Sequence, residues 1–138
     1  RDGDLDLFIE MGGAINGDKY HNILFQNPGH GHHWLTLKLI GEKSNRAAIG
    51  ARIKIVTAGE PAMTIYRHVT SGSSFGGNPL EQTIGLGTAQ QIAELEIRWP
   101  TSVTTQVFRD IAADQSIEVV EFAKEYRKLD TKRIEVAE

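Results

Sequence analysis

Three aspartates near the start of the chain are the side chains best suited to bind a metal ion. Asp2, Asp4 and Asp6 alternate with Gly3 and Leu5. Short calcium loops use this arrangement: carboxylates supply the charge, glycine supplies the sharp turn, and one ligand is often a backbone carbonyl. The sequence lacks the further Asp or Asn ligands that usually open such a loop. An acidic entry into a strand explains the same residues, so both interpretations stay open.

The histidine run after Gly29 is a second group of potential metal ligands. His30, His32 and His33 stand close together, and imidazoles two residues apart can ligate Zn²⁺ or Cu²⁺. A structural site needs two more protein ligands, and a catalytic site needs at least one. Because the stretch is rich in glycine and precedes a predicted strand, we interpret it as a linker. The chain has no cysteine, which excludes thiolate metal sites, disulfides and a cysteine nucleophile.

Nucleophilic and acid–base chemistry find little support in the sequence. The serines of segment 71–76 lie among glycines, but no strand, Gly-x-Ser-x-Gly elbow and helix surround them. The same segment lacks the Gly-Lys-Ser/Thr and the helix of a phosphate loop. Glu94 and Glu96 are expected to face solvent, whereas a general acid needs a desolvated carboxyl. We predict no catalytic residue.

Composition places the chain among ordinary globular domains. Its 138 residues are 40% hydrophobic and 24% charged, and the net charge is -3. This size suits one domain, and the balance argues against disorder. No window approaches about 18 consecutive apolar residues, so no membrane span is expected. A nucleic-acid partner is disfavoured because phosphate binding needs an excess of clustered Lys and Arg. The first residue is Arg1, which suggests a piece of a longer protein.

Apolar residues alternate with polar ones in several short runs separated by turn residues. In 34–41, Leu35, Leu37 and Leu39 share one face, and in 92–99 Leu95, Ile97 and Trp99 do so. The same period predicts strands at about 34–41, 51–56, 63–69, 92–99, 104–108 and 116–122.

These strands predict an all-β fold, an antiparallel β-sandwich or a small open barrel, because no long amphipathic helix separates them. Two further apolar runs, Leu5–Met11 and Asn22–Asn27, predict an N-terminal hairpin with a long connection. The charged tail suits a short terminal helix or a solvated extension. We therefore divide the chain into an N-terminal segment 1–29, a β domain 30–122 and a C-terminal extension 123–138.

Four blocks of the β domain resemble the ASPIC/UnbV domain of cartilage acidic protein-like proteins. They are WLTLKL at 34–39, SNRAAIGARI at 44–53, IGLG at 84–87 and EIRWP at 96–100. The resemblance covers residues 31–122, and the second block is the most specific. Segment 2–29 resembles the end of an FG-GAP/VCBS repeat, a β-propeller blade with a calcium loop. In such families, the propeller precedes the ASPIC/UnbV domain.

The resemblance implies a cofactor, a compartment and partners. Asp2 and Asp6 would be side-chain ligands to Ca²⁺, and Asp4 would offer its backbone carbonyl. The intact repeat would bind the ion, whereas this fragment would bind it weakly or not at all. A secreted, periplasmic or cell-surface location follows, with a preceding propeller as the nearest partner. Because the blade strands have lost their neighbours, a dimer through their exposed edges is a further expectation.

We expect a non-enzymatic binding or accessory module with a protein or glycan ligand. Arg46 and Arg52 bracket the predicted turn at 45–50, where their guanidinium groups could bond loop carbonyls or a carboxylate, or bind a ligand. His68 is the third candidate ligand-binding residue. Two alternatives remain. Part of an active site would require a concave pocket near these residues and the loop 71–78, with a perturbed titratable group. An RNA-binding module would require aromatic and basic residues on one sheet face.

Overall fold

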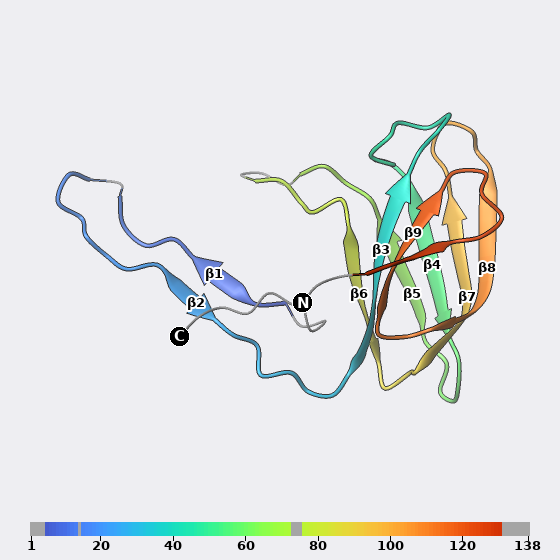
Figure 1. Ribbon diagram of the computed structural model, residues 1–138, viewed down its shortest axis with the longest axis horizontal. Helices are drawn as coiled ribbons and strands as arrows, with labels where there is room; N and C mark the ends of the chain where they lie inside the picture. Colours follow the sequence, from blue (N-terminus) through green and yellow to red (C-terminus); the bar gives the residue numbers. More distant parts are fainter. Residues whose placement is uncertain (1–4, 14, 73–75, 131–138) are drawn as a thin grey trace.

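The computed structural model describes residues 5–13, 15–72 and 76–130, and these form ten strands and no helix. Eight of the strands build two four-stranded sheets that face each other as a sandwich (Figure 1). One sheet has the order β10 (Arg127–Leu129), β9 (Gln115–Val120), β3 (His33–Ile40), β6 (Gln82–Gly87). The other has the order β5 (Thr64–His68), β4 (Arg52–Thr57), β7 (Gln91–Arg98), β8 (Thr105–Ala112). The all-β prediction is confirmed, as a sandwich and not a closed barrel.

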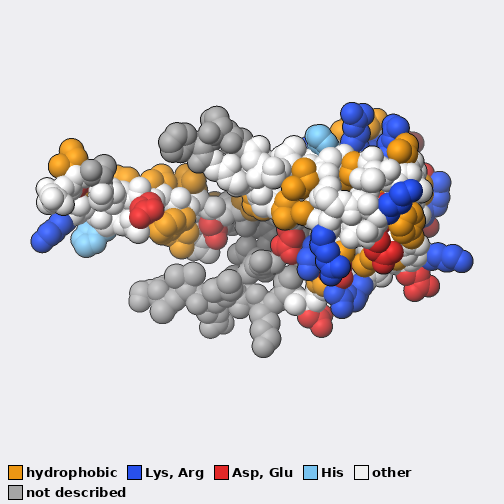
Figure 2. Space-filling view, turned by 90° about the horizontal axis from the view of Figure 1, so that it is seen from above, with side chains coloured by type: hydrophobic (Ala, Val, Ile, Leu, Met, Phe, Trp, Pro, Cys, Tyr) orange, Lys and Arg blue, Asp and Glu red, His pale blue; other side chains and the backbone are white. Residues whose placement is uncertain are grey.

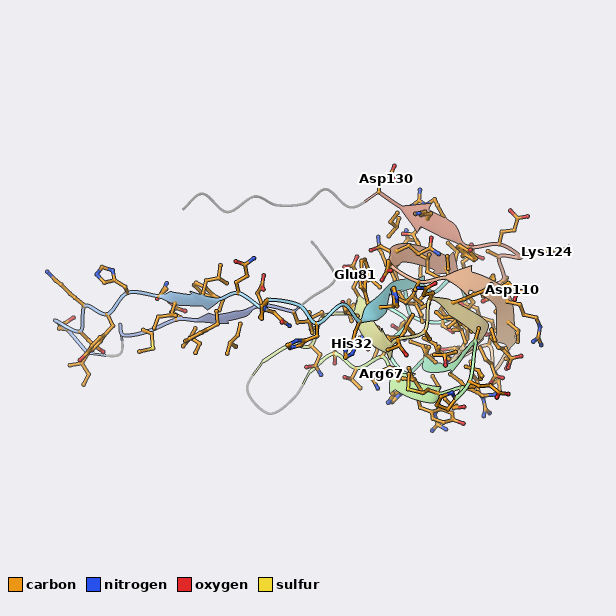
Figure 3. The ribbon with its side chains drawn as sticks, turned by 90° about the horizontal axis from the view of Figure 1, so that it is seen from below. His32, Arg67, Glu81, Asp110, Lys124 and Asp130 are labelled. Atoms are coloured by element: carbon orange, nitrogen blue, oxygen red, sulfur yellow. The ribbon has the colours of Figure 1, made fainter. Side chains whose placement is uncertain are left out.

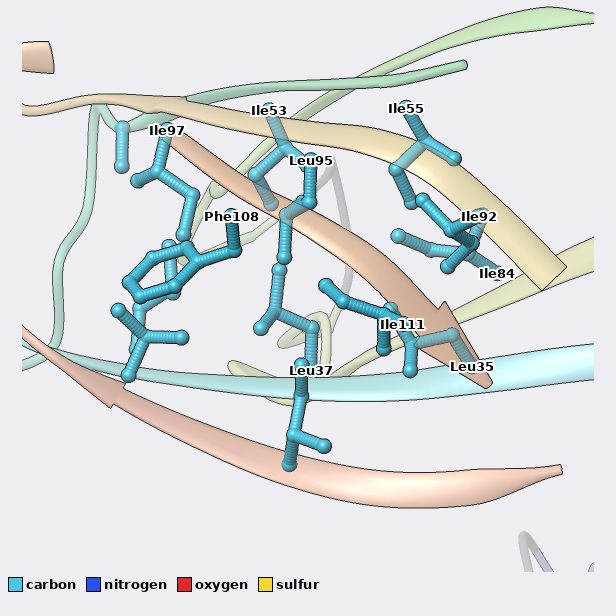
Figure 4. Packing of buried hydrophobic residues seen from close by; sticks show 14 of the residues in the cluster. Leu35, Leu37, Ile53, Ile55, Ile84, Ile92, Leu95, Ile97, Phe108 and Ile111 are labelled. Carbon is cyan, nitrogen blue, oxygen red and sulfur yellow. The ribbon is translucent and has the colours of Figure 1, made fainter. Parts of the chain in front are cut away.

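The core forms where the predicted inward stripes of the two sheets meet. Leu35 and Leu37 of β3 are fully buried, as are Leu95 and Ile97 of β7, whereas the residues between them are more polar. Figure 4 shows these aliphatic side chains interleaved between the sheets, with Phe108 at one end. Burial of this apolar surface is the main stabilising term of the sandwich. The sheets therefore form a self-contained hydrophobic core.

Three details of the expected architecture were wrong. Strand β6 is missing from the predicted strands, although Ile84 and Leu86 alternate inward, because glycines such as Gly85 and Gly87 are typical of turns. The expected terminal helix is wrong within the described residues, since Arg127–Leu129 pairs with β9 as a strand. The sandwich is also not wholly antiparallel, because β3 pairs with β9 in parallel. Parallel neighbours need a long crossover, and here strands of the other sheet provide it in place of a helix.

The predicted N-terminal hairpin is present, and it extends away from the sandwich (Figure 1). Strand β1 (Leu7–Ile9) pairs antiparallel with β2 (Ile23–Phe25), and neither joins the two larger sheets. The ladder is shorter than the two apolar runs predicted. Within the described part of the chain, no helix is long and apolar enough to cross a membrane.

Candidate functional site

A buried carboxylate organises the loop between β3 and β4. Glu121 follows β9 and is 1% exposed. Its Oε2 accepts hydrogen bonds from the backbone N–H groups of residues 42, 43 and 44, at 2.8, 2.8 and 2.7 Å. Its Oε1 accepts from the hydroxyls of Ser44 and Ser102, at 2.8 and 2.6 Å. This carboxylate therefore ties the loop to the end of β9.

The electrostatics of Glu121 follow from these donors. Burial alone raises the pKa of a carboxyl, because it disfavours the charged form. Hydrogen bonds from Ser102, from Ser44 and from the N–H of Glu42 outweigh the burial and lower the pKa of Glu121 from 4.5 to about 2. The group is thus an anion at physiological pH. Because protein donors surround it, we interpret it as a structural anchor.

The rest of this loop is shaped by close backbone packing. A Cβ atom on Gly41 would lie 2.2 Å from the carbonyl oxygen of Asn45, so only glycine fits there. The Asn45 side chain accepts from the N–H of Ile49 at 2.9 Å and donates to its carbonyl at 2.7 Å. Gly50 has φ +98°, as the predicted tight turn requires. The SNRAAIGAR block is therefore a precisely held loop.

The structure places two of the three predicted ligand-binding residues, Arg52 and His68, side by side and the third, Arg46, on a loop. Arg46 is exposed on the loop, and Arg52 and His68 face each other across β4 and β5. Arg98 of β7 lies opposite Arg52 on the other side of β4. His68, Arg52 and Arg98 therefore form one basic row on the outer face of this sheet. Among the described residues, neither Arg46 nor Arg52 has a side-chain hydrogen bond or ion pair. Within the described chain, Glu121 and Asn45 hold the turn by hydrogen bonds to its backbone.

The candidate metal ligands do not converge in the part of the chain that the structure describes. Asp2 and Asp4 lie outside the described residues. Asp6 is exposed, and its Oδ1 accepts the N–H of Asn27 at 2.9 Å. The His33 Nδ1 lies 2.6 Å from Asp114 Oδ2. Residues 5–13, 15–72 and 76–130 contain no group of three or more His, Asp or Glu arranged to hold a metal ion.

A cavity of about 510 Å³ lies beside the outer face of the β3–β6 sheet, a volume within the range of small-molecule sites. Its described lining includes six neutral hydrogen-bonding side chains: Thr36, Thr70, Asn78, Gln82, Thr83 and Ser116. The apolar part of its lining includes Trp34 and Leu5. His68 and Glu81 also line it, whereas Arg46 and Arg52 do not. Figure 3 places Glu81 at the end of the sandwich from which the hairpin leaves, opposite Lys124.

The active-site alternative named His68 and the loop 71–78 for a pocket, and His68 and Asn78 line this cavity, whereas its other residues come from segments that sequence reasoning did not connect. Trp34 and Thr36 belong to β3, Thr83 to β6, and Asn78 to the loop before it. In the described part of the chain, the carboxyls whose pKa is shifted are Glu118 and Glu121, and neither lines the cavity. The cavity thus meets one condition set for an active site, a concave pocket near His68. It does not bring a carboxyl of lowered pKa into that pocket.

Fold and site together describe a two-sheet β-sandwich with a polar cavity on one outer face. Comparison with known families is more specific: the family model described as ASPIC and UnbV matches residues 41–125. The match covers more than half of the chain, which therefore belongs to this family. It includes the loop anchored by Glu121, the whole β5-β4-β7-β8 sheet, and β6 and β9 of the other sheet, whereas β3 precedes it and β10 follows it. No curated protein and no solved structure matches the chain.

Proposed function

We propose that this chain is a non-enzymatic extracytoplasmic binding module, joined through its hairpin to a calcium-stabilised β-propeller in the full-length protein. One observation carries the proposal: both faces of the hairpin are apolar and exposed. Cross-strand partners share a face, so Leu7 and Phe25 lie on one side and Phe8 and Leu24 on the other. These four side chains are between 48% and 60% exposed. Figure 2 shows hydrophobic side chains along the projecting arm.

Such a hairpin needs partners on both faces. A two-stranded ribbon is marginally stable alone in water, and a sheet with one solvated face would show polar residues on that side. Each blade of a propeller lies between two other blades, so both of its faces are covered. The outer edges of β1 and β2 are also unpaired within the described chain, and a four-stranded blade would supply strands for them. Asp2, Asp4 and Asp6 precede this hairpin in the sequence, and their spacing supports a calcium loop in the intact repeat.

Hydrogen exchange on the full-length gene product tests this proposal. In the 138-residue chain, we expect the amides of 7–9 and 23–25 to exchange quickly. In the full-length protein they should exchange about 100-fold more slowly, because neighbouring blades cover them. Removal of Ca²⁺ with a chelator should restore fast exchange in the hairpin and leave β3 and β7 protected. The proposal would be overturned if the hairpin amides exchanged as fast in the full-length protein as in the 138-residue chain. It would also be overturned if they were protected only when the full-length protein dimerises.

The basic row on the outer face of the second sheet favours a different candidate function, RNA binding. Arg52 and Arg98 stand side by side, and Tyr66 lies on the same face. Glu94 and Glu96 occupy this face too, and the net charge of -3 opposes a nucleic-acid partner. Filter binding at two salt concentrations decides the matter. Salt-sensitive RNA retention that is lost in Arg52→Ala would favour this alternative.

A further inference from the structure

Trp34 is partly buried and lines the cavity on the β3–β6 face. Its cross-strand neighbour on β6 is Gly85, and a Cβ built there meets no atom within 4 Å. The space over that strand is therefore open. The indole N–H of Trp34 has no acceptor among the described residues, whereas that of the buried Trp99 donates to Gln106. A half-buried tryptophan with a free donor is unusual, because such groups normally find partners when the ring is buried.

The polar groups around Trp34 are neutral and retain unused bonding capacity. The Asn78 amide nitrogen donates to Thr70 at 3.1 Å, and the Gln82 amide nitrogen donates to the carbonyl of Pro79 at 3.0 Å. These bonds fix the two amides and leave both amide oxygens without a donor among the described residues. The Thr36 and Thr83 hydroxyls lie 3.4 Å apart. Hydroxyls and amides can both donate and accept.

The charge of the lining indicates which ligands are disfavoured. The described lining contains no lysine or arginine, and Glu81 is its acidic member. Apart from the His68 imidazole, the described lining would offer a phosphate, sulfate or carboxylate group no cationic partner for its lost hydration. Lys38, two residues beyond Thr36 on the same face, does not line the cavity and pairs with Glu118 at 3.0 Å, and the basic row at Arg52 and Arg98 belongs to the other sheet. The cavity therefore suits an uncharged ligand rich in hydroxyl groups.

We propose that this cavity binds a neutral carbohydrate, with one sugar ring stacked on Trp34. The ring C–H groups of a sugar form an apolar face that packs on an indole, while its hydroxyls are both donors and acceptors, matching the amides and hydroxyls around it. The cavity volume of about 510 Å³ accommodates a short oligosaccharide. This inference rests on the proposed binding function and names its ligand class. Because Leu5 lines the cavity, the base of the hairpin forms part of the site.

Titration with defined oligosaccharides tests the assignment. Neutral gluco-, manno-, xylo- and chito-oligosaccharides are compared with oligogalacturonate and a heparin fragment, with isothermal titration calorimetry as the readout, because it does not depend on the tryptophan that is later replaced. We expect saturable binding of at least one neutral series and none of the charged ones. Trp34→Ala should weaken that binding by about tenfold or more. The matched control is Tyr66→Ala, which removes a 67% exposed aromatic side chain from the other sheet and should leave binding unchanged.

Three outcomes would overturn the carbohydrate assignment: no binding of any neutral series at millimolar concentration, binding of charged series only, or equal affinity in Trp34→Ala and the parent chain. Circular dichroism of each variant confirms that the sandwich is intact. None of these results depends on the propeller, since hairpin exchange in the full-length protein is a separate measurement. If the oligosaccharides fail to bind but the hairpin is protected in the full-length protein, the proposed attachment to a propeller is supported and the carbohydrate ligand is excluded.

Discussion

Replacement of Glu121 by glutamine tests whether this carboxylate anchors the loop. The carboxylate accepts three backbone N–H groups and two hydroxyls while fully buried. An amide of the same shape removes the charge and turns an NH₂ group toward some of these donors. Lowering the pKa from 4.5 to about 2 corresponds to about 3 kcal/mol of folding stability. We expect Glu121→Gln to lose about this much in urea denaturation near neutral pH.

The pH dependence gives this prediction its sign. A carboxyl with a lowered pKa in the folded state stabilises the protein fully above its unfolded pKa, and this contribution is lost as the pH falls. The stability difference between the parent chain and Glu121→Gln should therefore narrow as the pH falls from 4.5 to about 2. Glu118, whose pKa Lys38 and Arg127 lower, titrates in both proteins and cancels in the comparison. A loss no larger than that of the exposed control Glu125→Gln, about 0.5 kcal/mol or less, would refute the reasoning.

Two further substitutions test the same loop. Gly41→Ala should lower the free energy of unfolding in urea by about 2 kcal/mol or more, because its Cβ would lie 2.2 Å from a backbone oxygen. The control Gly85→Ala, where a Cβ meets no atom within 4 Å, should change it by about 0.5 kcal/mol at most. Equal effects of the two substitutions would contradict the packing argument. Asn45→Ala should cost about 1–2 kcal/mol in thermal or urea unfolding, because it removes two hydrogen bonds that pin the turn. The exposed Arg46→Ala should be near neutral, and a larger loss for Arg46 than for Asn45 would reverse the assignment of the anchor.

Local patterning predicted most of the core. Leu37, Ile53 and Leu95 could be placed inside because period-two alternation is a property of a single strand. The parallel pairing of β3 with β9 could not be predicted, because it joins residues about 80 positions apart and depends on how the sheets stack. Strand β6 was missed for a local reason, since its glycines carry the sequence signal of a turn.

The sites were harder to predict than the core. Glu121 stands at the end of an apolar strand, and nothing in its neighbourhood distinguishes a buried anchor from a solvated acid. Its role depends on donors from two loops, at residues 42–44 and at Ser102. The cavity has the same origin, because Trp34 and Asn78 meet only in the folded chain. His68 was named among the ligand-binding residues and lines this cavity, so it remains a candidate that the oligosaccharide titrations can examine.

The measurement that tests the carbohydrate site most directly is an NMR titration of the two indole N–H resonances. Trp34 lies at the cavity, and Trp99 is 1% exposed in the core, so the two signals report on the site and on the fold separately. Addition of a neutral oligosaccharide should shift the Trp34 resonance saturably and leave that of Trp99 in place. An unmoved Trp34 resonance at saturating sugar, or equal shifts of both, would contradict the account.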